Sequence, residues 1–305
     1  MNFNPTKFDY IKHRKIYFTI TIALVLISVL LLVFRGLNLG IDFTEGTRVE
    51  IASENTIKEA DVRSVIEDAG IDAEEINGVQ FAQGGKLANV TFVGEFSQDQ
   101  ISEMKQVIEA EYGKEPSIST VSAQVGQEIA RNAIYAVLLA SLGIVIYVSF
   151  RFQPLYGIAT VLALLHDALM IIAFFSLFQI EVNLYFIAAV LTIIGYSVND
   201  TIVTFDRVRE NLGLAEKGGR QVTFSELSHI VNESIQQTII RSINTVVTVI
   251  MTAAALYIFG SEAIRGFSLA LLVGLIMGMY SSIFIAAQLW LVMKGRTLKS
   301  SKQAS

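Results

Sequence analysis

The residues of this chain best able to do chemistry are charged side chains inside long apolar segments. His166 and Asp167 lie side by side in one such segment, Asn199 and Asp200 lie together in the next, and Arg241 stands where a further segment begins. An ionisable group inside a membrane is costly, so each one is by default a hypothesis about function. The chemistry that such groups offer is the binding and release of a proton.

Asp200 is the strongest candidate for a proton carrier. An ionised aspartate that faces lipid is untenable, so Asp200 must be neutral, paired with a cation or hydrated. One hypothesis makes Asp200 a carboxyl group that is alternately protonated and neutralised by a cation such as Arg241. The alternative is a fixed hydrogen bond or ion pair that holds the helices together. The same two interpretations apply to Asp167, where the fixed interaction is favoured.

The other polar groups point less clearly to chemistry. Adjacent residues on a helix do not face one site, so His166 and Asp167 are not expected to share a metal ion. Asn199 and Asn244 are expected mainly to bond helices to one another. The chain has no cysteine, which excludes disulfides, zinc–thiolate sites and iron–sulfur clusters. We therefore expect neither a metal nor a cofactor.

The elements that hold these residues are predicted to be membrane spans. Hydrophobic residues make up 52% of the 305 and charged residues 17%, and the mean hydropathy is +0.53. This composition excludes an ordinary soluble enzyme and a nucleic-acid binder, whose basic surface would lie on a hydrated domain. A span needs about 20 mostly apolar residues. Six segments qualify: Ile16–Phe34, Ala133–Phe150, Gly157–Phe178, Val182–Phe205, Ser242–Phe259 and Gly266–Met293.

The basic residues orient these spans. Four precede the first span, five lie between Asp206 and Arg241, and four follow Met293. Short loops rich in Lys and Arg stay in the cytoplasm, so both termini are predicted to be cytoplasmic. The predicted parts are an N-terminus with an uncleaved first span (residues 1–35), the other five spans (133–293) and a cytoplasmic tail (294–305).

Residues 36–132 interrupt the spans and are predicted to form an acidic α+β domain outside the cytoplasm. They contain 18 acidic and seven basic residues. Alternating and helical spacings predict the order strand, helix, two strands, helix, strand, which is that of a ferredoxin-like split βαβ unit. These residues include no histidine, no cysteine and no glycine-rich phosphate loop, so nothing in their sequence suggests catalysis. The strands are predicted at Thr47–Ala52, Ile76–Ala82, Leu87–Val93 and Ser117–Val125, and the helices at Ile57–Ala69 and after Ser97.

The segment 206–241, between the fourth and fifth spans, is predicted to contain an amphipathic helix. Thr223 and Glu226 have the spacing of a capping box, which marks a helix start. The apolar residues that follow share one face, so we expect the helix to lie on the inner membrane surface and to lead into Arg241.

A stripe of small residues runs along the last predicted span. Small side chains let helix backbones approach closely, which is what packing in a membrane requires. The stripe contacts either another helix of this chain or a separate partner, and the spacing does not decide between them. Its members recur every four residues: Gly266, Ala270, Gly274, Gly278, Ser282 and Ala286.

Several motifs resemble one known family, the SecD/SecF family of protein-export membrane proteins. The longest is G-Y-S-V-N-D-T-I-V-T-F-D-R-V-R-E-N, from Gly195 to Asn211. Leu165-His166-Asp167 and the run from Asn232 to Thr245 agree as well. Glu45 departs from the pattern, because the family has glycine before Gly46, and a tight turn at that point is therefore not expected.

This resemblance implies half of a resistance-nodulation-division architecture in a bacterial cytoplasmic (inner) membrane. It also implies SecD, the SecYEG channel, an associated insertase, a translocating preprotein and membrane lipid as partners. Asp200 and Arg241 match the family's proton-pathway residues, and Asn199, Asp206 and Arg207 belong to the same motif.

The expected function is that of a non-enzymatic auxiliary subunit of the Sec protein translocase. It would use the proton-motive force, with the proton gradient as its energy source, to promote late preprotein export together with SecD. Two alternatives stay open: half of a small-molecule or lipid exporter of the same superfamily, and a passive scaffold for translocon assembly.

Overall fold

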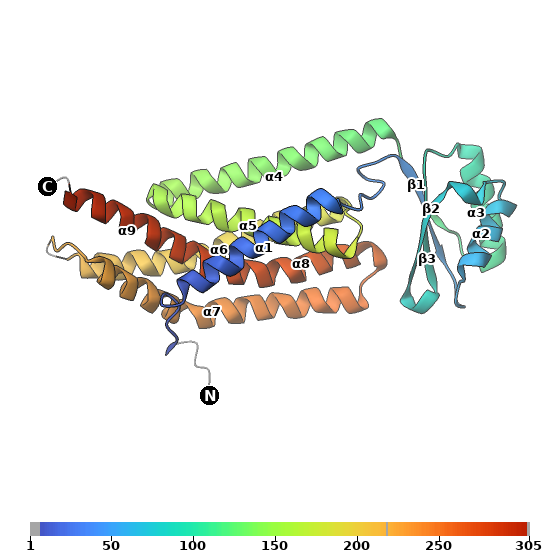
Figure 1. Cartoon of the computed structure of the whole chain (residues 1–305). Helices are drawn as coiled ribbons and strands as arrows, with labels where there is room; N and C mark the ends of the chain where they lie inside the picture. The colour runs from blue at the N-terminus through green and yellow to red at the C-terminus, as the bar shows by residue number, and fades with distance from the viewer. Residues whose placement is uncertain (1–6, 218, 304–305) are drawn as a thin grey trace. The chain divides into compact units, whose positions relative to one another are not determined.

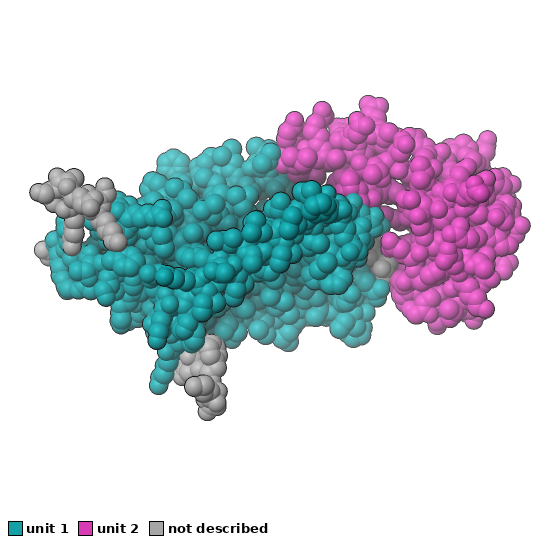
Figure 2. Space-filling view, in the orientation of Figure 1, with its two compact units in different colours: residues 1–38, 136–305 teal, residues 39–135 magenta. Residues whose placement is uncertain are grey.

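The chain divides into two compact units, which Figure 2 shows in different colours. The computed structural model describes residues 7–217 and 219–303. Unit 1 comprises Met1–Asn38 and Ala136–Ser305, and unit 2 comprises Leu39–Tyr135. The boundaries of the predicted insert, 36 and 132, differ from those of unit 2 by three residues at each end.

Six helices within the described ranges are long and apolar enough to cross a membrane, in agreement with the six predicted spans (Figure 1). A multi-pass membrane protein follows from their length and composition. The sixth helix contains a π-helical turn between two α-helical parts. The helices are α1 (Arg14–Phe34), α4 (Ala123–Arg151), α5 (Pro154–Phe178), α6 (Leu184–Ala215), α7 (Phe224–Phe259), and α8 (Glu262–Ser281) with the π turn (Ser282–Ala286) and α9 (Ala287–Gln303).

Helix α7 joins the predicted amphipathic helix and the fifth span into one continuous helix. It begins at the predicted capping box, since Thr223 Oγ1 accepts a hydrogen bond from the Glu226 N–H at 3.3 Å and Glu226 Oε2 accepts one from the Thr223 N–H at 2.9 Å. Its apolar face is covered by protein rather than lipid, because Leu227 and Val231 are buried. The expected helix on the membrane surface is therefore replaced by a helix packed into the bundle, beside the extended end of α6.

The stripe of small residues packs inside this chain, against α6. A Cβ atom added at Gly274 would lie 2.1 Å from Cδ1 of Ile193, and one at Gly278 would lie 3.2 Å from Cβ of Ser197. Ala270 is fully buried. The spacing alone did not show whether the stripe contacts this chain or a partner. These close contacts show that the middle of the stripe packs at the interface between α6 and α8.

Unit 2 is a four-stranded antiparallel sheet with two helices on one face (Figure 1). The strand order is β2-β3-β1-β4, and the predicted sequence of strands and helices is confirmed. The last strand ends earlier than predicted, because α4 already begins at Ala123. The ferredoxin-like classification stays a prediction. The elements are β1 (Gly46–Ala52), α2 (Glu59–Asp68), β2 (Ile76–Ala82), β3 (Leu87–Phe92), α3 (Gln98–Tyr112) and β4 (Ser117–Val121).

The core of unit 2 lies between the sheet and the helices. Alternate residues of β1, Val49 and Ile51, face Val62 and Ile66 of α2 and the helix α3. The predicted cap at Ser97 is present as a complete capping box with Gln100. The chain enters β1 through a turn in which Phe43 and Thr44 donate backbone hydrogen bonds to the Gly40 carbonyl, so Glu45 lies after the turn.

Candidate proton site

Asp200 lies within α6, about 24 Å from the start of the helix at 1.5 Å per residue. It is partly buried, and its Oδ1 atom accepts a hydrogen bond of 2.5 Å from Ser242 of α7. Its Oδ2 atom is buried and has no hydrogen-bond partner of ordinary geometry among the described residues, although the Ser282 side chain is close enough to interact with the carboxyl group. One carboxylate oxygen is thus held by a neighbouring helix, and the other is available for a proton or a water molecule.

A small cavity adjoins this carboxyl group. Its volume is about 20 Å³, which is room for about one water molecule. Residues of α6, α7 and α8 line it, including Asn199, Asp200, Thr245 and Gly278. A carboxyl oxygen without an ordinary hydrogen bond to a described residue, beside a water-sized space, is an arrangement suited to proton exchange.

Asp167 has a different environment, in which three side chains hold it. Its Oδ2 atom accepts hydrogen bonds from Ser197 of α6 at 2.6 Å and Ser281 of α8 at 2.7 Å. Its Oδ1 atom lies 3.1 Å from Nδ1 of His166. Asp167 is almost fully buried. A carboxyl group with both oxygens engaged on three sides is suited to joining α5, α6 and α8, so its membership of the proton pathway finds no support in this geometry.

The π turn links the surroundings of the two aspartates. Ser281 donates to Asp167, and the next residue, Ser282, lies 2.9 Å from the Thr201 hydroxyl of α6. Ser282 also donates to the Ser197 backbone carbonyl at 3.4 Å. Single π turns within α-helices occur frequently at functional sites. Here Ser281 at the end of α8 and Ser282 at the start of the π turn contact two different helices, α5 and α6.

Arg241 is near enough to Asp200 to act on it through its charge, but the two do not form an ion pair. The Arg241 side chain is exposed and forms no ion pair within the described part of the chain, so the expected Arg241–Asp200 pair is absent. Consecutive helix residues point about 100° apart. Ser242 faces α6 and bonds Asp200 directly, whereas Arg241 acts on Asp200 only through its charge.

Asn199, Asp206 and Arg207, which belong to the same sequence motif as Asp200, do not bond to its carboxyl group. Asn199 is exposed, although it lines the small cavity. Asp206 forms exposed ion pairs with Arg209 at 2.8 Å and Arg151 at 3.4 Å, and Arg207 pairs with Glu210. None of these ion pairs involves Asp200. Exposed pairs of this kind contribute little to stability.

Ser242 and Ser197 are the functional candidates that sequence reasoning missed. Each is a small hydroxyl residue within an apolar helix, and each donates to one of the two aspartates. Hydroxyl groups in spans ordinarily bond their own helix backbone, so residue type alone did not separate these two from the others.

Comparison with known proteins identifies the family. The family described as "Protein export membrane protein SecD/SecF, C-terminal" matches residues 100–296, and the "SecD/SecF GG Motif" matches residues 30–57. The protein translocase subunit SecF of Alicyclobacillus acidocaldarius is 38% identical, over 97% of this chain and 96% of its own. The subunit SecDF of Bacillus subtilis is 47% identical, over 96% of this chain but only 39% of its own length.

Solved structures agree with these relatives. The crystal structure of SecDF from Thermus thermophilus superimposes with a TM-score of 0.81 at 31% identity, over 94% of this chain and 38% of that one. A SecDF crystal structure in a super-membrane-facing form gives a TM-score of 0.68 at 29% identity, over 98% of this chain and 40% of the other. The chain belongs to the SecD/SecF family of protein-export membrane proteins.

Proposed function

We propose that this chain is a proton-motive-force-driven auxiliary subunit of the Sec protein translocase that promotes late preprotein export. The names of its relatives, SecF and SecDF, support a role as a membrane subunit of that translocase. The observation that carries the proton-driven part is the Asp200 carboxyl group. One of its oxygens is bonded to Ser242, and the other has no hydrogen bond of ordinary geometry to a described residue and lies beside a small cavity.

The proposed step is a change in the charge of Asp200. When Asp200 gives up its proton, its carboxylate keeps the Ser242 hydrogen bond and the second oxygen requires a water molecule or a cation. When it is protonated, that requirement disappears and α6 and α7 are free to pack differently. Moving one elementary charge through 100 mV supplies about 2.3 kcal/mol. A few protons therefore suffice to shift a two-state equilibrium of the chain.

The proposal includes a SecD partner. The Bacillus relative is a single chain named SecDF, of which this chain matches 39%, so a second part of comparable or larger size is expected beside this one. We also propose that the SecYEG channel, its associated insertase, the preprotein and membrane lipid are contacted. In this arrangement the termini lie in the cytoplasm, and unit 2 acts outside it as a ferredoxin-like domain.

Export into inverted membrane vesicles tests the role of Asp200. The variant Asp200→Asn keeps the size and the acceptor oxygen but cannot ionise, so it should assemble normally and lose the response of export to an imposed proton gradient. Asp200→Glu retains an ionisable group and should retain part of that response. A full gradient response by Asp200→Asn, at equal protein levels, would exclude Asp200 as the proton carrier.

A further inference from the structure

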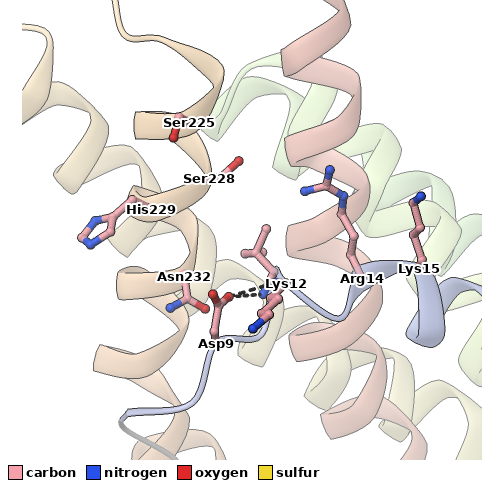
Figure 3. A pocket seen from close by; sticks show the side chains of 9 residues that line it. Asp9, Lys12, Arg14, Lys15, Ser225, Ser228, His229 and Asn232 are labelled. Carbon is pink, nitrogen blue, oxygen red and sulfur yellow. Dashed lines mark hydrogen bonds between the residues drawn. The ribbon is translucent and has the colours of Figure 1, made fainter.

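The N-terminal segment and the beginning of α7 enclose a second, strongly basic cavity (Figure 3). Its volume is about 360 Å³. In Figure 3, Lys12, Arg14 and Lys15 lie on one side, and His229 with two serines of α7 lies on the other. Asp200 is not among the residues that line this cavity, and the proposed proton step does not involve it.

The cations of this cavity have no anionic partner within residues 7–217 and 219–303. Lys12, Arg14 and Lys15 form no ion pair with any described residue. The one carboxylate at the cavity belongs to Asp9, and its Oδ1 atom already accepts the backbone N–H groups of Ile11 and Lys12 at 3.1 and 2.9 Å. The cavity therefore has an excess of positive charge that an anion would neutralise.

The walls of the cavity are held in position. The Tyr10 backbone N–H donates to Asn232 Oδ1 at 2.8 Å, and Gln236 donates to the Phe8 carbonyl at 2.9 Å, which fixes the N-terminal segment on α7. The Arg14 guanidinium lies over the Phe224 ring at 5.6 Å. An anion entering here meets cations that are already in place rather than on a free tail.

An apolar groove follows the cations along the same face of α1. Residues four and seven positions apart share a helix face, so Phe18 and Thr21 lie on the face of Arg14, and Ile22 lies on the face of Lys15. Phe18, Thr21 and Ile22 line a groove of about 530 Å³ with α5 and α9. Apart from His166 and Thr21, whose hydroxyl lies 3.1 Å from that of Tyr280, its lining is apolar.

We propose that these two features form one binding site for an anionic phospholipid. The phosphate of the headgroup is bound by Lys12, Arg14 and Lys15, and an acyl chain lies in the groove along Phe18 and Ile22. A phospholipid has its charged headgroup directly beside its acyl chains. The chain matches this order, because the apolar run of α1 begins at Ile16, directly after the last cation, Lys15. Basic residues beside a span attract anionic lipids, and a groove next to them selects a molecule that is both charged and apolar.

Native mass spectrometry of the full-length protein, purified in detergent with any co-purifying partner, tests this site. Titration with phosphatidylglycerol should show one retained lipid, whereas phosphatidylcholine at the same concentration should not be retained. The double variant Lys12→Gln/Lys15→Gln leaves the Arg14–Phe224 contact intact and should weaken phosphatidylglycerol binding by roughly tenfold or more. The matched control Lys217→Gln/Lys294→Gln removes the same charge elsewhere and should bind as the wild type does.

Two further arms separate a lipid from a free anion. Ile22→Trp fills the groove and keeps every cation, so it should weaken phosphatidylglycerol binding while leaving the affinity for inorganic phosphate unchanged. Inorganic phosphate should displace the lipid only at far higher concentration. Equal retention of both lipids, undiminished binding to the double lysine variant, or inorganic phosphate that binds as tightly as the lipid would each overturn the proposal.

Discussion

Ser242 of α7 donates a hydrogen bond of 2.5 Å to Oδ1 of Asp200 on α6, across 42 positions of the sequence. This bond joins α6 and α7 at a partly buried carboxyl group within the bundle. It also occupies the position that sequence reasoning gave to Arg241. The carboxylate form of Asp200 is therefore stabilised by a neutral hydroxyl donor rather than by a paired charge.

Ser242→Ala tests the importance of this bond. Its loss removes a donor that stabilises the carboxylate form more strongly than the protonated form, so gradient-driven export should shift its pH dependence toward higher pH. A hydrogen bond to a charged group is worth about 1.5–3 kcal/mol, which corresponds to about one to two pH units. The measurement is export rate against pH in inverted vesicles with a constant gradient.

The control for Ser242→Ala is Ser268→Ala. Ser268 is equally buried, but its hydroxyl bonds the Ile264 carbonyl of its own helix. Its pH profile should match that of the wild type. Identical profiles for the two variants would show that the Ser242 hydroxyl does not act on Asp200.

Asp167 is expected to behave as a structural residue. Asp167→Asn retains an acceptor for Ser197 and Ser281, so the gradient response of export should persist. Asp167→Ala leaves the Ser197 hydroxyl without its acceptor, whereas Ser281 can still donate to the Gly278 carbonyl, so the free energy of unfolding should fall by about 1–3 kcal/mol. Thermal unfolding in detergent and the vesicle assay separate the two effects. A loss of the gradient response in stable Asp167→Asn would place this residue in the proton pathway after all.

The contact between Gly274 and Ile193 gives a prediction about helix packing. Gly274→Ala places a methyl group in the space that Ile193 occupies, so overpacking should destabilise the protein by about 1–3 kcal/mol. The second substitution Ile193→Ala makes room and should restore part of that loss. Both effects are measured by thermal unfolding of the purified chain.

Gly266 belongs to the same stripe and serves as the control. A Cβ atom there meets nothing within 4 Å, so Gly266→Ala should leave the unfolding temperature unchanged. If Gly274→Ala proved harmless to the isolated chain but prevented co-purification with a partner, the stripe would face the partner instead of α6.

The core of unit 2 gives a prediction that needs no membrane. Residues 39–135 expressed alone should unfold cooperatively, because one continuous core joins the sheet to α2 and α3. Ile66 is fully buried in that core, and Ile66→Ala should lower the free energy of unfolding by about 2–5 kcal/mol. Urea unfolding followed by circular dichroism measures it. Val93→Ala, at a largely exposed position, should change it little, and a fragment without a cooperative transition would contradict the prediction.

Local features of this protein could be predicted from the sequence because they depend on neighbouring residues. Apolar runs long enough for a membrane gave six helices, and the spacing of Thr223 and Glu226 marked the start of α7. Alternating apolar residues gave the order of strands and helices in unit 2. The cost of a carboxyl group in an apolar segment singled out Asp200 without any knowledge of its neighbours.

The tertiary structure alone decided which groups meet. The Ser242–Asp200 and Ser281–Asp167 bonds span 42 and 114 positions, and a rotation of about 100° between adjacent residues is enough to exchange Arg241 for Ser242. Likewise, an apolar helix face and a stripe of small residues look the same whether lipid, a partner or the same chain covers them. Burial of Val231 and the contact of Gly274 with Ile193 follow from how α6, α7 and α8 pack, and that packing is a property of the whole bundle.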